Sequence, residues 1–191
     1  TVMLSEIDSN AEKMVSDLKD NSAISDVQKA LLAHDRLADF CEYKIFEDTA
    51  SLEYRYSHNI YGAMVTGKAV CQGYLLEKLG IPSYACTSTA LNHVWNIVYV
   101  NDNYYHVDVT WDDPVWSPTD WDVTGKVYHN YFLVSTEYLM AHNHNASDYD
   151  TTPPDTSLDS YFWQNSETSF QLLGDNIYYF DNNSCALKNY D

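Results

Sequence analysis

The amino-acid sequence predicts an α+β fold in which helices come first and an antiparallel sheet follows. Apolar residues recur at helical spacing between residues 4 and 41, and runs rich in aromatic and β-branched residues begin at residue 83. The chain has 191 residues, 45% of them hydrophobic, which is enough for one domain with a sizeable core. We therefore expect a soluble globular protein rather than a disordered one.

Two helices are predicted near the N-terminus. The first covers residues 4–18, where apolar residues return every three or four positions. The second begins after Ser25, because Gln28 follows three residues later and the two form a capping-box pattern. The expected buried stripe of this second helix consists of Val27, Ala30, Leu31, Leu37, Ala38 and Cys41.

A third helix and a set of strands follow. The helix, "CQGYLLEKL", covers residues 71–79 and is expected to end at Gly80, with Pro82 just beyond. The turn residues Asn101 and Asp102 join two strands into a hairpin. The strand-like runs are residues 83–88, 94–100, 104–111 and 131–135.

Composition divides the chain into three parts. Residues 1–143 form the expected main domain. Residues 144–160, "HNASDYDTTPPDTSLDS", are rich in small polar residues, which is typical of a linker or a long surface connection. Residues 161–191 contain two or three short strands with polar turns. They are too few to fold alone, so they either pack on the main domain or begin a second module.

The charge of the chain disfavours several classes of partner. With 28 acidic and 10 basic residues the formal charge is −18, which repels phosphate backbones and anionic lipid headgroups. We therefore expect no nucleic-acid partner. No apolar run approaches the ~20 residues of a membrane span, and the N-terminal residues show no signal-peptide pattern, so we expect no membrane insertion. The sequence does not indicate an oligomeric state.

No metal site and no cofactor are predicted. The four cysteines have no CxxC spacing and define neither a metal site nor a compartment. Histidines and acidic residues do gather in the second half of the chain, but no ligand spacing supports a metal, and we expect these side chains in solvated loops. They are His129, His142, His144, Asp112, Asp113, Asp120 and Asp122.

Cys71 is the candidate nucleophile. It follows a Gly-containing turn and opens a predicted helix, where unpaired backbone N–H groups and the helix dipole favour a thiolate. The same N–H groups can hold an oxyanion. The alternative is a buried structural thiol, because free cysteine is among the most buried residue types.

His93 and Asp108 are candidate partners for that nucleophile. A two-residue turn at 101–102 places His93 opposite Thr110, with Asp108 as its diagonal neighbour on the same face, at a Cβ separation of ~7–8 Å or less. An imidazole and a carboxylate can meet across that distance. His106 shares a face with Asp108 and is the main rival for its carboxylate. The alternative is a strand-end cap at Asp108 and a surface histidine.

Three separated motifs carry a resemblance to a known family. They are "GKAVCQGY" at residues 67–74, "LGIPS" at 79–83 and "NHVWNIVYVNDNYYHVDVTWDDP" at 92–114. Between Ala23 and Val134 the chain resembles the transglutaminase-like superfamily of bacterial proteins, which has a papain-like thiol-enzyme core. The resemblance implies a papain-like α+β fold and a bacterial protein that is secreted or attached to the cell surface.

The resemblance also implies an activity. Cys71, His93 and Asp108 match the family triad, in which the thiol attacks a carboxamide or peptide carbonyl and forms a thioester. The histidine acts as base and then acid, and the aspartate orients it. Water as acceptor gives hydrolysis, and a lysine amine gives a cross-link, so the implied partner is a peptide or protein substrate.

Substrate-binding candidates flank the triad. Gln72 follows the nucleophile and either lines the site or is solvated. Trp95 and Trp111 either shape an acyl-substrate groove or belong to the core. The helix from Cys71 to Gly80 is shorter than in the family by about six residues, with a length of ~13 Å. A true deletion there would weaken activity, so a catalytically weak peptide-binding or structural module is the alternative.

Overall fold

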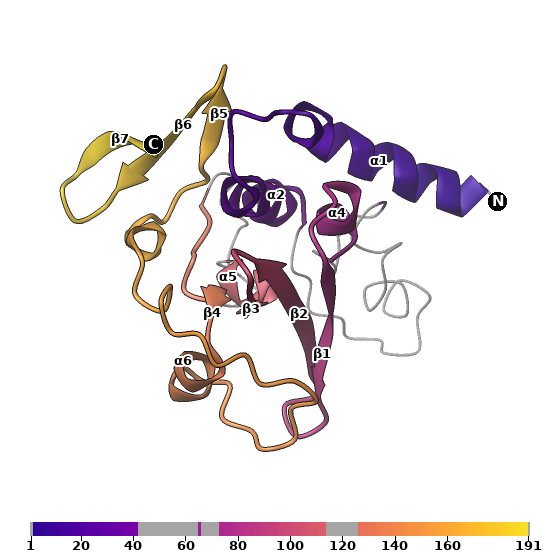
Figure 1. The fold of residues 1–191 in the computed structure, drawn as a ribbon, viewed down its shortest axis with the longest axis vertical. Helices are drawn as coiled ribbons and strands as arrows, with labels where there is room; N and C mark the ends of the chain where they lie inside the picture. Colours follow the sequence, from indigo (N-terminus) through magenta and orange to yellow (C-terminus); the bar gives the residue numbers. More distant parts are fainter. Residues whose placement is uncertain (1, 42–64, 66–72, 114–125, 191) are drawn as a thin grey trace, which may run out of the picture.

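The computed structural model describes residues 2–41, 65, 73–113 and 126–190, which form an α+β fold with antiparallel sheets. None of the helices in these ranges is long and apolar enough to cross a membrane. The elements, in chain order, are α1 (Val2–Lys19), α2 (Asp26–Phe40), α4 (Gly73–Lys78), β1 (Ser83–Ser88), β2 (His93–Val100), β3 (Asn103–Val107), α5 (Val109–Asp112), β4 (Phe132–Val134), α6 (Thr136–Ala141), the 3-10 helix η2 (Phe162–Asn165), β5 (Gln171–Leu173), β6 (Asn176–Asp181) and β7 (Ala186–Tyr190) (Figure 1).

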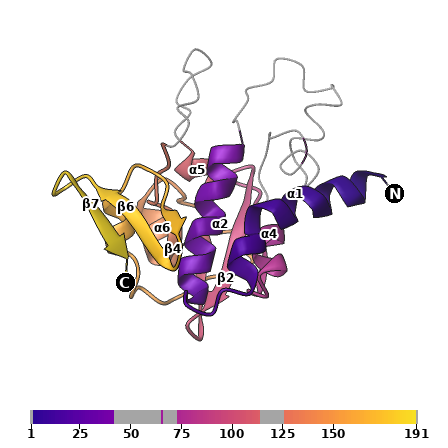
Figure 2. The same ribbon diagram turned by 90° about the horizontal axis from the view of Figure 1, so that it is seen from above.

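Helix α2 starts with the predicted capping box and lies at the centre of the molecule. Gln28 N donates to Ser25 Oγ at 3.3 Å, and Ser25 N donates to Gln28 Oε1 at 2.8 Å. The predicted stripe is buried. His34 and Asp35 are buried too, because α2 lies between α1 on one side and the C-terminal strands on the other (Figure 2). The helix therefore buries more than the single face that its periodicity predicts.

The main sheet has the strand order β1-β2-β3-β4, and all neighbours are antiparallel. Asn101 and Asp102 form the predicted two-residue turn, with φ of 51° and 63°, which suits the tight turn between twisted strands. Val100 pairs with Asn103 as this turn requires. The hairpin prediction is confirmed.

The third strand is shorter than predicted. β3 ends at Val107, and the chain turns into α5 instead of continuing as a strand to residue 111. The cause is the side chain of Asp108, whose Oδ1 accepts from the backbone N–H groups of Thr110 and Trp111 and so caps the helix. Thr110 therefore does not pair across the sheet with His93.

Helix α4 ends where the sequence predicts. Gly80 has φ of 76°, Gly80 N donates to the carbonyl of Glu77 at 3.0 Å, and Ile81 N donates to that of Leu76 at 2.9 Å. This bonding is a Schellman motif, in which a glycine takes the left-handed conformation at low cost. The predicted start of this helix, which includes Cys71, lies outside the described residues.

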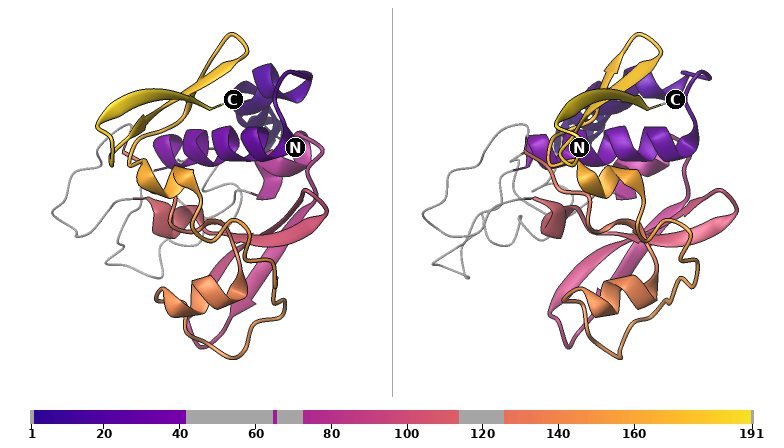
Figure 3. Two further views of the ribbon diagram at one scale, coloured as in Figure 1. Left: turned by 60° about the vertical axis from the view of Figure 1, so that its left-hand side comes forward. Right: turned by 90° about the vertical axis from the view of Figure 1, so that its left-hand side faces the viewer.

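The C-terminal residues form a second sheet, with strand order β5-β6-β7, that lies across α2 (Figure 3). The three strands agree with the predicted two or three. Phe170 N donates to Asp35 Oδ2 at 2.5 Å, and Ser169 Oγ donates to Asp39 Oδ2 at 2.6 Å. These bonds join the sheet to α2. That residues 161–191 begin a further module stays a prediction.

Hydrogen bonds tie residues 144–160 to the end of β1 and to the start of α6. Ser88 Oγ at the end of β1 donates to Asp148 at 2.7 Å. Ser135 Oγ, which precedes α6, donates to Asp159 at 2.6 Å. These bonds hold the segment in place, and its first residue, His144, is buried. That the segment is a linker or a surface connection stays a prediction.

Candidate active site

The hairpin brings His93 and Asp108 together. His93 is the first residue of β2, and Asp108 follows the last residue of β3. Nε2 of His93 lies 2.5 Å from Oδ2 of Asp108. The side chain of His93 is 15% exposed, whereas that of Asp108 is buried. The pair thus has one end open to solvent and one end fixed in the interior.

Asp108 is held from several directions. Its Oδ1 accepts from the backbone N–H groups of Thr110 at 3.1 Å and Trp111 at 3.3 Å, and its own N–H donates to the Tyr131 carbonyl at 3.0 Å. Burial raises the pKa of Asp108, but hydrogen bonds from His144 and His93 outweigh burial and lower the pKa to about 2. The carboxylate is therefore ionised near neutral pH.

The ionised carboxylate fixes the tautomer of His93. A carboxylate only accepts hydrogen bonds, so Nε2 of His93 carries a proton, and Nδ1 of the neutral ring has a lone pair. The ring stacks on Trp95 at 5.5 Å between centroids, with 22° between planes. His93 can therefore take a proton at Nδ1 without turning its ring.

Trp95 supports this ring from within the core. It is buried, and its Nε1 donates to Nδ1 of His106 at 2.9 Å. Because the indole N–H only donates, Nδ1 of His106 is an acceptor and its Nε2–H donates to Thr136 Oγ1 at 2.8 Å. Burial, with the neighbouring His144, lowers the pKa of His106 to about 3. His106 is thus neutral and is not the rival for Asp108, which corrects the prediction.

The residue that does share Asp108 is His144, for which the sequence predicts a solvated loop. Its ring is buried, and Nε2 lies 2.9 Å from Asp108 Oδ2. The expectation was wrong because "HNHNASDYD" has the composition of an exposed loop. No local pattern signals a contact that spans 36 residues.

The remaining predicted site residues separate into two groups. Cys71 and Gln72 lie outside the described residues, so their roles stay predictions. Trp111 is 41% exposed, and its ring centroid lies 6.2 Å from that of His93. Trp111 is therefore open to solvent beside His93, whereas Trp95 packs on the His93 ring from the core. Their substrate-binding roles stay predictions.

A second buried network anchors α5, the helix that Asp108 caps. His34 of α2 bonds with Asp35 at 2.8 Å and with Asp112 of α5 at 3.1 Å. His129 bonds with Asp35 at 2.9 Å, and Asp112 also accepts from the backbone N–H of Tyr131. Burial opposes the charge on His34, but its bonds to Asp112 and Asp35 raise its pKa to about 9. The network contradicts the solvated-loop expectation for His129 and Asp112.

In the described part of the chain, two groups of three side chains each bring possible metal-ligand atoms within 4.8 Å of one another: His34, Asp35 and His129, and His93, Asp108 and His144. In both groups the ring nitrogens point at carboxylate oxygens at hydrogen-bonding distance. Hydrogen bonds between histidines and aspartates therefore explain why the side chains of each group lie so close together.

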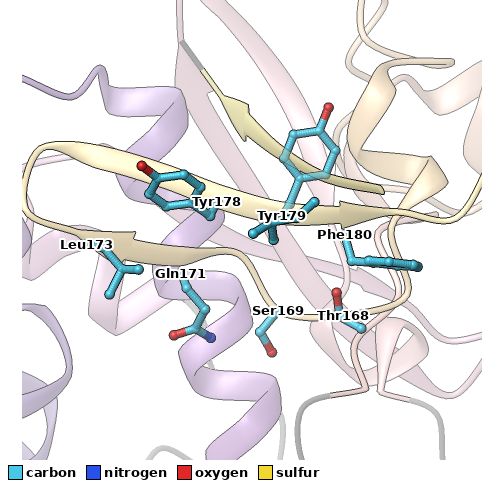
Figure 4. A pocket seen from close by; sticks show the side chains of 8 residues that line it. Thr168, Ser169, Gln171, Leu173, Tyr178, Tyr179 and Phe180 are labelled. Atoms are coloured by element: carbon cyan, nitrogen blue, oxygen red, sulfur yellow. The ribbon is translucent and has the colours of Figure 1, made fainter. Parts of the chain in front are cut away.

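A shallow pocket lies elsewhere, on the C-terminal sheet (Figure 4). Neither His93 nor Asp108 contributes to it, and its lining is mainly apolar and aromatic. It is formed by Thr168, Ser169, Gln171, Leu173, Tyr178, Tyr179, Phe180 and Leu187.

No family model and no curated protein matches the chain. Among solved structures, a chain described as "Crystal structure of a TGase" is similar to it, with 15% sequence identity and a TM-score of 0.44. The similarity covers 67% of this chain and 36% of that chain, so it spans little more than a third of the TGase chain. This likeness concerns the course of the backbone.

Proposed function

We propose that the protein is a transglutaminase-like cysteine enzyme that uses Cys71, His93 and Asp108 for acyl transfer. The observation that carries the proposal is the hydrogen bond of 2.5 Å between Nε2 of His93 and Oδ2 of Asp108. It leaves Nδ1 of a partly exposed ring as the proton acceptor, which is the arrangement a thiol nucleophile needs from its base. The three sequence motifs supply Cys71 as that nucleophile.

The proposed reaction has two halves. Nδ1 of His93 takes the proton of the Cys71 thiol, and the thiolate attacks the carbonyl carbon of an amide. The tetrahedral intermediate then expels ammonia or an amine, which receives the proton from His93, and a thioester remains. In the second half His93 removes a proton from water or from a lysine amine. That nucleophile attacks the thioester, and the thiol leaves with the proton returned.

The proposed substrate is a peptide or protein with a glutamine side chain or a susceptible peptide bond. Trp111 stands beside His93 on the exposed side and offers an apolar surface to the acyl part of the substrate. Gln72, next to the nucleophile, is a further proposed contact. We also propose a secreted or surface-attached bacterial setting, which rests on the sequence resemblance.

The proposal is tested by trapping the acyl-enzyme. The full chain is incubated with a glutamine-containing peptide, with and without a primary amine, and intact mass is followed. The expected results are a mass increase on Cys71, release of ammonia, and transfer to the amine or to water. Cys71→Ser and His93→Gln should abolish the adduct.

An alternative outcome is equally measurable. Peptide binding that survives Cys71→Ser, with no adduct and no turnover in the wild type, would contradict the proposed enzyme activity and indicate a peptide-binding module. His142→Gln is the matched control, because His142 is exposed and its Nδ1 bonds to the Tyr138 carbonyl of its own helix. It should behave as the wild type in either case.

A further inference from the structure

Two histidines donate to one oxygen of Asp108. Nε2 of His93 lies 2.5 Å from Oδ2, and Nε2 of His144 lies 2.9 Å from the same atom. Because an ionised carboxylate only accepts, both ring nitrogens carry protons. The negative charge that orients His93 is therefore divided between two hydrogen bonds.

The surroundings of His144 hold its ring in this one place. The ring is buried and packs against Trp111 at 4.3 Å and Tyr131 at 4.9 Å between centroids. Its Nδ1 lies 3.4 Å from the His142 carbonyl, and its own carbonyl accepts from the Tyr149 hydroxyl. Burying a polar ring is costly unless its nitrogens are bonded, and the charged partner of this ring is Asp108.

We propose that His144 is a positioning residue of the acyl-transfer site, which holds Asp108 in place and limits how strongly that carboxylate retains a proton on His93. This inference rests on the proposed function, in which His93 must both accept a proton and give it up. An oxygen that accepts two N–H donors stabilises each less than an oxygen that accepts one. His144 therefore makes the protonated form of His93 a better acid toward the leaving amine.

Among the residues that the structure describes, the other titratable groups near the pair do not supply this effect. His106 on β3 is held neutral by the Trp95 N–H, and burial raises the pKa of Tyr131 and, to about 12, that of Tyr149, so these hydroxyls are neutral as well. A place for Cys71 beside His93 is part of the proposed function. Three carboxylates lie further out, and each raises the pKa of one neighbour. Asp112 does so for Tyr131, Asp148 for Tyr149 and Asp150 for His106.

The test measures the pKa of His93 directly by NMR of its imidazole nitrogens. The full chain carries Cys71→Ala, which removes titration of the thiol from the measurement. In this background His144→Phe keeps a ring among Trp111 and Tyr131 but removes the donor, whereas His144→Gln keeps an N–H donor. His142→Gln, two residues away, is the matched control.

We expect the pKa of His93 to rise by about one unit in His144→Phe and to stay within about 0.3 unit of its starting value in the other two variants. An unchanged pKa in His144→Phe, or an equal rise in the His142 control, would overturn the inference. If His144→Phe does not fold, the protonation of His144 Nε2 in the chain that carries only Cys71→Ala is measured by NMR instead. A protonated Nε2 of His144 with slow exchange supports the inference, and an unprotonated one contradicts it.

This outcome is separable from that of the proposed function. A raised pKa of His93 in His144→Phe, with no acyl-enzyme in the wild type, would support the effect of His144 on Asp108 and His93 and would contradict the proposed enzyme activity. Acyl-enzyme formation in the wild type, with an unchanged pKa of His93 in His144→Phe, would contradict only the proposed role of His144.

Discussion

His34 and Asp112 join α2 to α5 through a buried hydrogen bond of 3.1 Å. Asp112 lies at the end of the short helix that Asp108 caps, so this bond fixes the helix on which the proposed triad depends. The pKa of His34 is raised to about 9, because hydrogen bonds to Asp112 and Asp35 outweigh its burial.

The raised pKa makes stability depend on pH. A histidine with a raised folded-state pKa stabilises the fold fully below its unfolded pKa of ~6.5, and this contribution is lost as pH rises through about 9. We expect the free energy of unfolding to fall on the order of 3 kcal/mol across that window. Urea unfolding at pH 6 and pH 9.5 measures it, and His34→Gln should flatten the difference. An equal pH dependence in His34→Gln would contradict this role.

Asp108→Asn separates the two tasks of Asp108. Asparagine is as good a helix cap as aspartate, so Oδ1 should still accept the N–H groups of Thr110 and Trp111. The amide NH2 in place of Oδ2 leaves the buried Nε2–H of His144 without its acceptor, so stability should fall by about 1–3 kcal/mol. The carboxylate that orients His93 is lost, and activity should fall by roughly four orders of magnitude. Asp148→Asn is the control, because Asp148 also accepts a backbone N–H, from Ala90 at 3.0 Å, away from the triad. Acyl transfer and thermal unfolding are measured together. Retained activity in Asp108→Asn would exclude the proposed role.

Thr136→Val tests the support behind Trp95. The Thr136 hydroxyl accepts from Nε2 of the buried His106, and valine would leave that N–H unsatisfied. The expected loss of stability is about 1–3 kcal/mol. Thr87→Val is the control, since the Thr87 hydroxyl bonds with Asp150 at an exposed position, and its loss should cost little. Equal losses in both variants, measured by denaturant unfolding, would show that the bond to His106 adds nothing.

The parts of the fold that the sequence predicts have local signals. The capping box at Ser25, the turn at Asn101 and Asp102, and the glycine after α4 each place the needed side chain within a few residues. The sequence predicts too long a β3, because aromatic and β-branched residues continue to Trp111, whereas the side chain of Asp108 caps a helix there.

The candidate site was predictable only where the hairpin defines it. A two-residue turn brings His93 near Asp108 whatever the rest of the chain does. The bonds from His144 to Asp108 and from His34 to Asp112 span 36 and 78 residues and join segments with no shared pattern. Tertiary packing decides such contacts, and a single sequence does not reveal them.

The central claim is that Cys71 is a thiol activated by His93, and the pH dependence of its alkylation by iodoacetamide tests it most directly. Two other cysteines serve as internal controls. Cys185 is exposed and therefore accessible to the reagent, whereas burial and Asp150 raise the pKa of Cys86 to about 12 and should keep it unreactive until the chain unfolds.

Peptide mass spectrometry at a series of pH values gives the rate for each cysteine. We expect Cys71 to react much faster than Cys185 near neutral pH, with an apparent pKa well below the ~8.5 of a free thiol, and we expect His93→Gln to remove this difference in rate. If Cys71 reacts no faster than Cys185 and shows the pH dependence of a free thiol, His93 does not activate it.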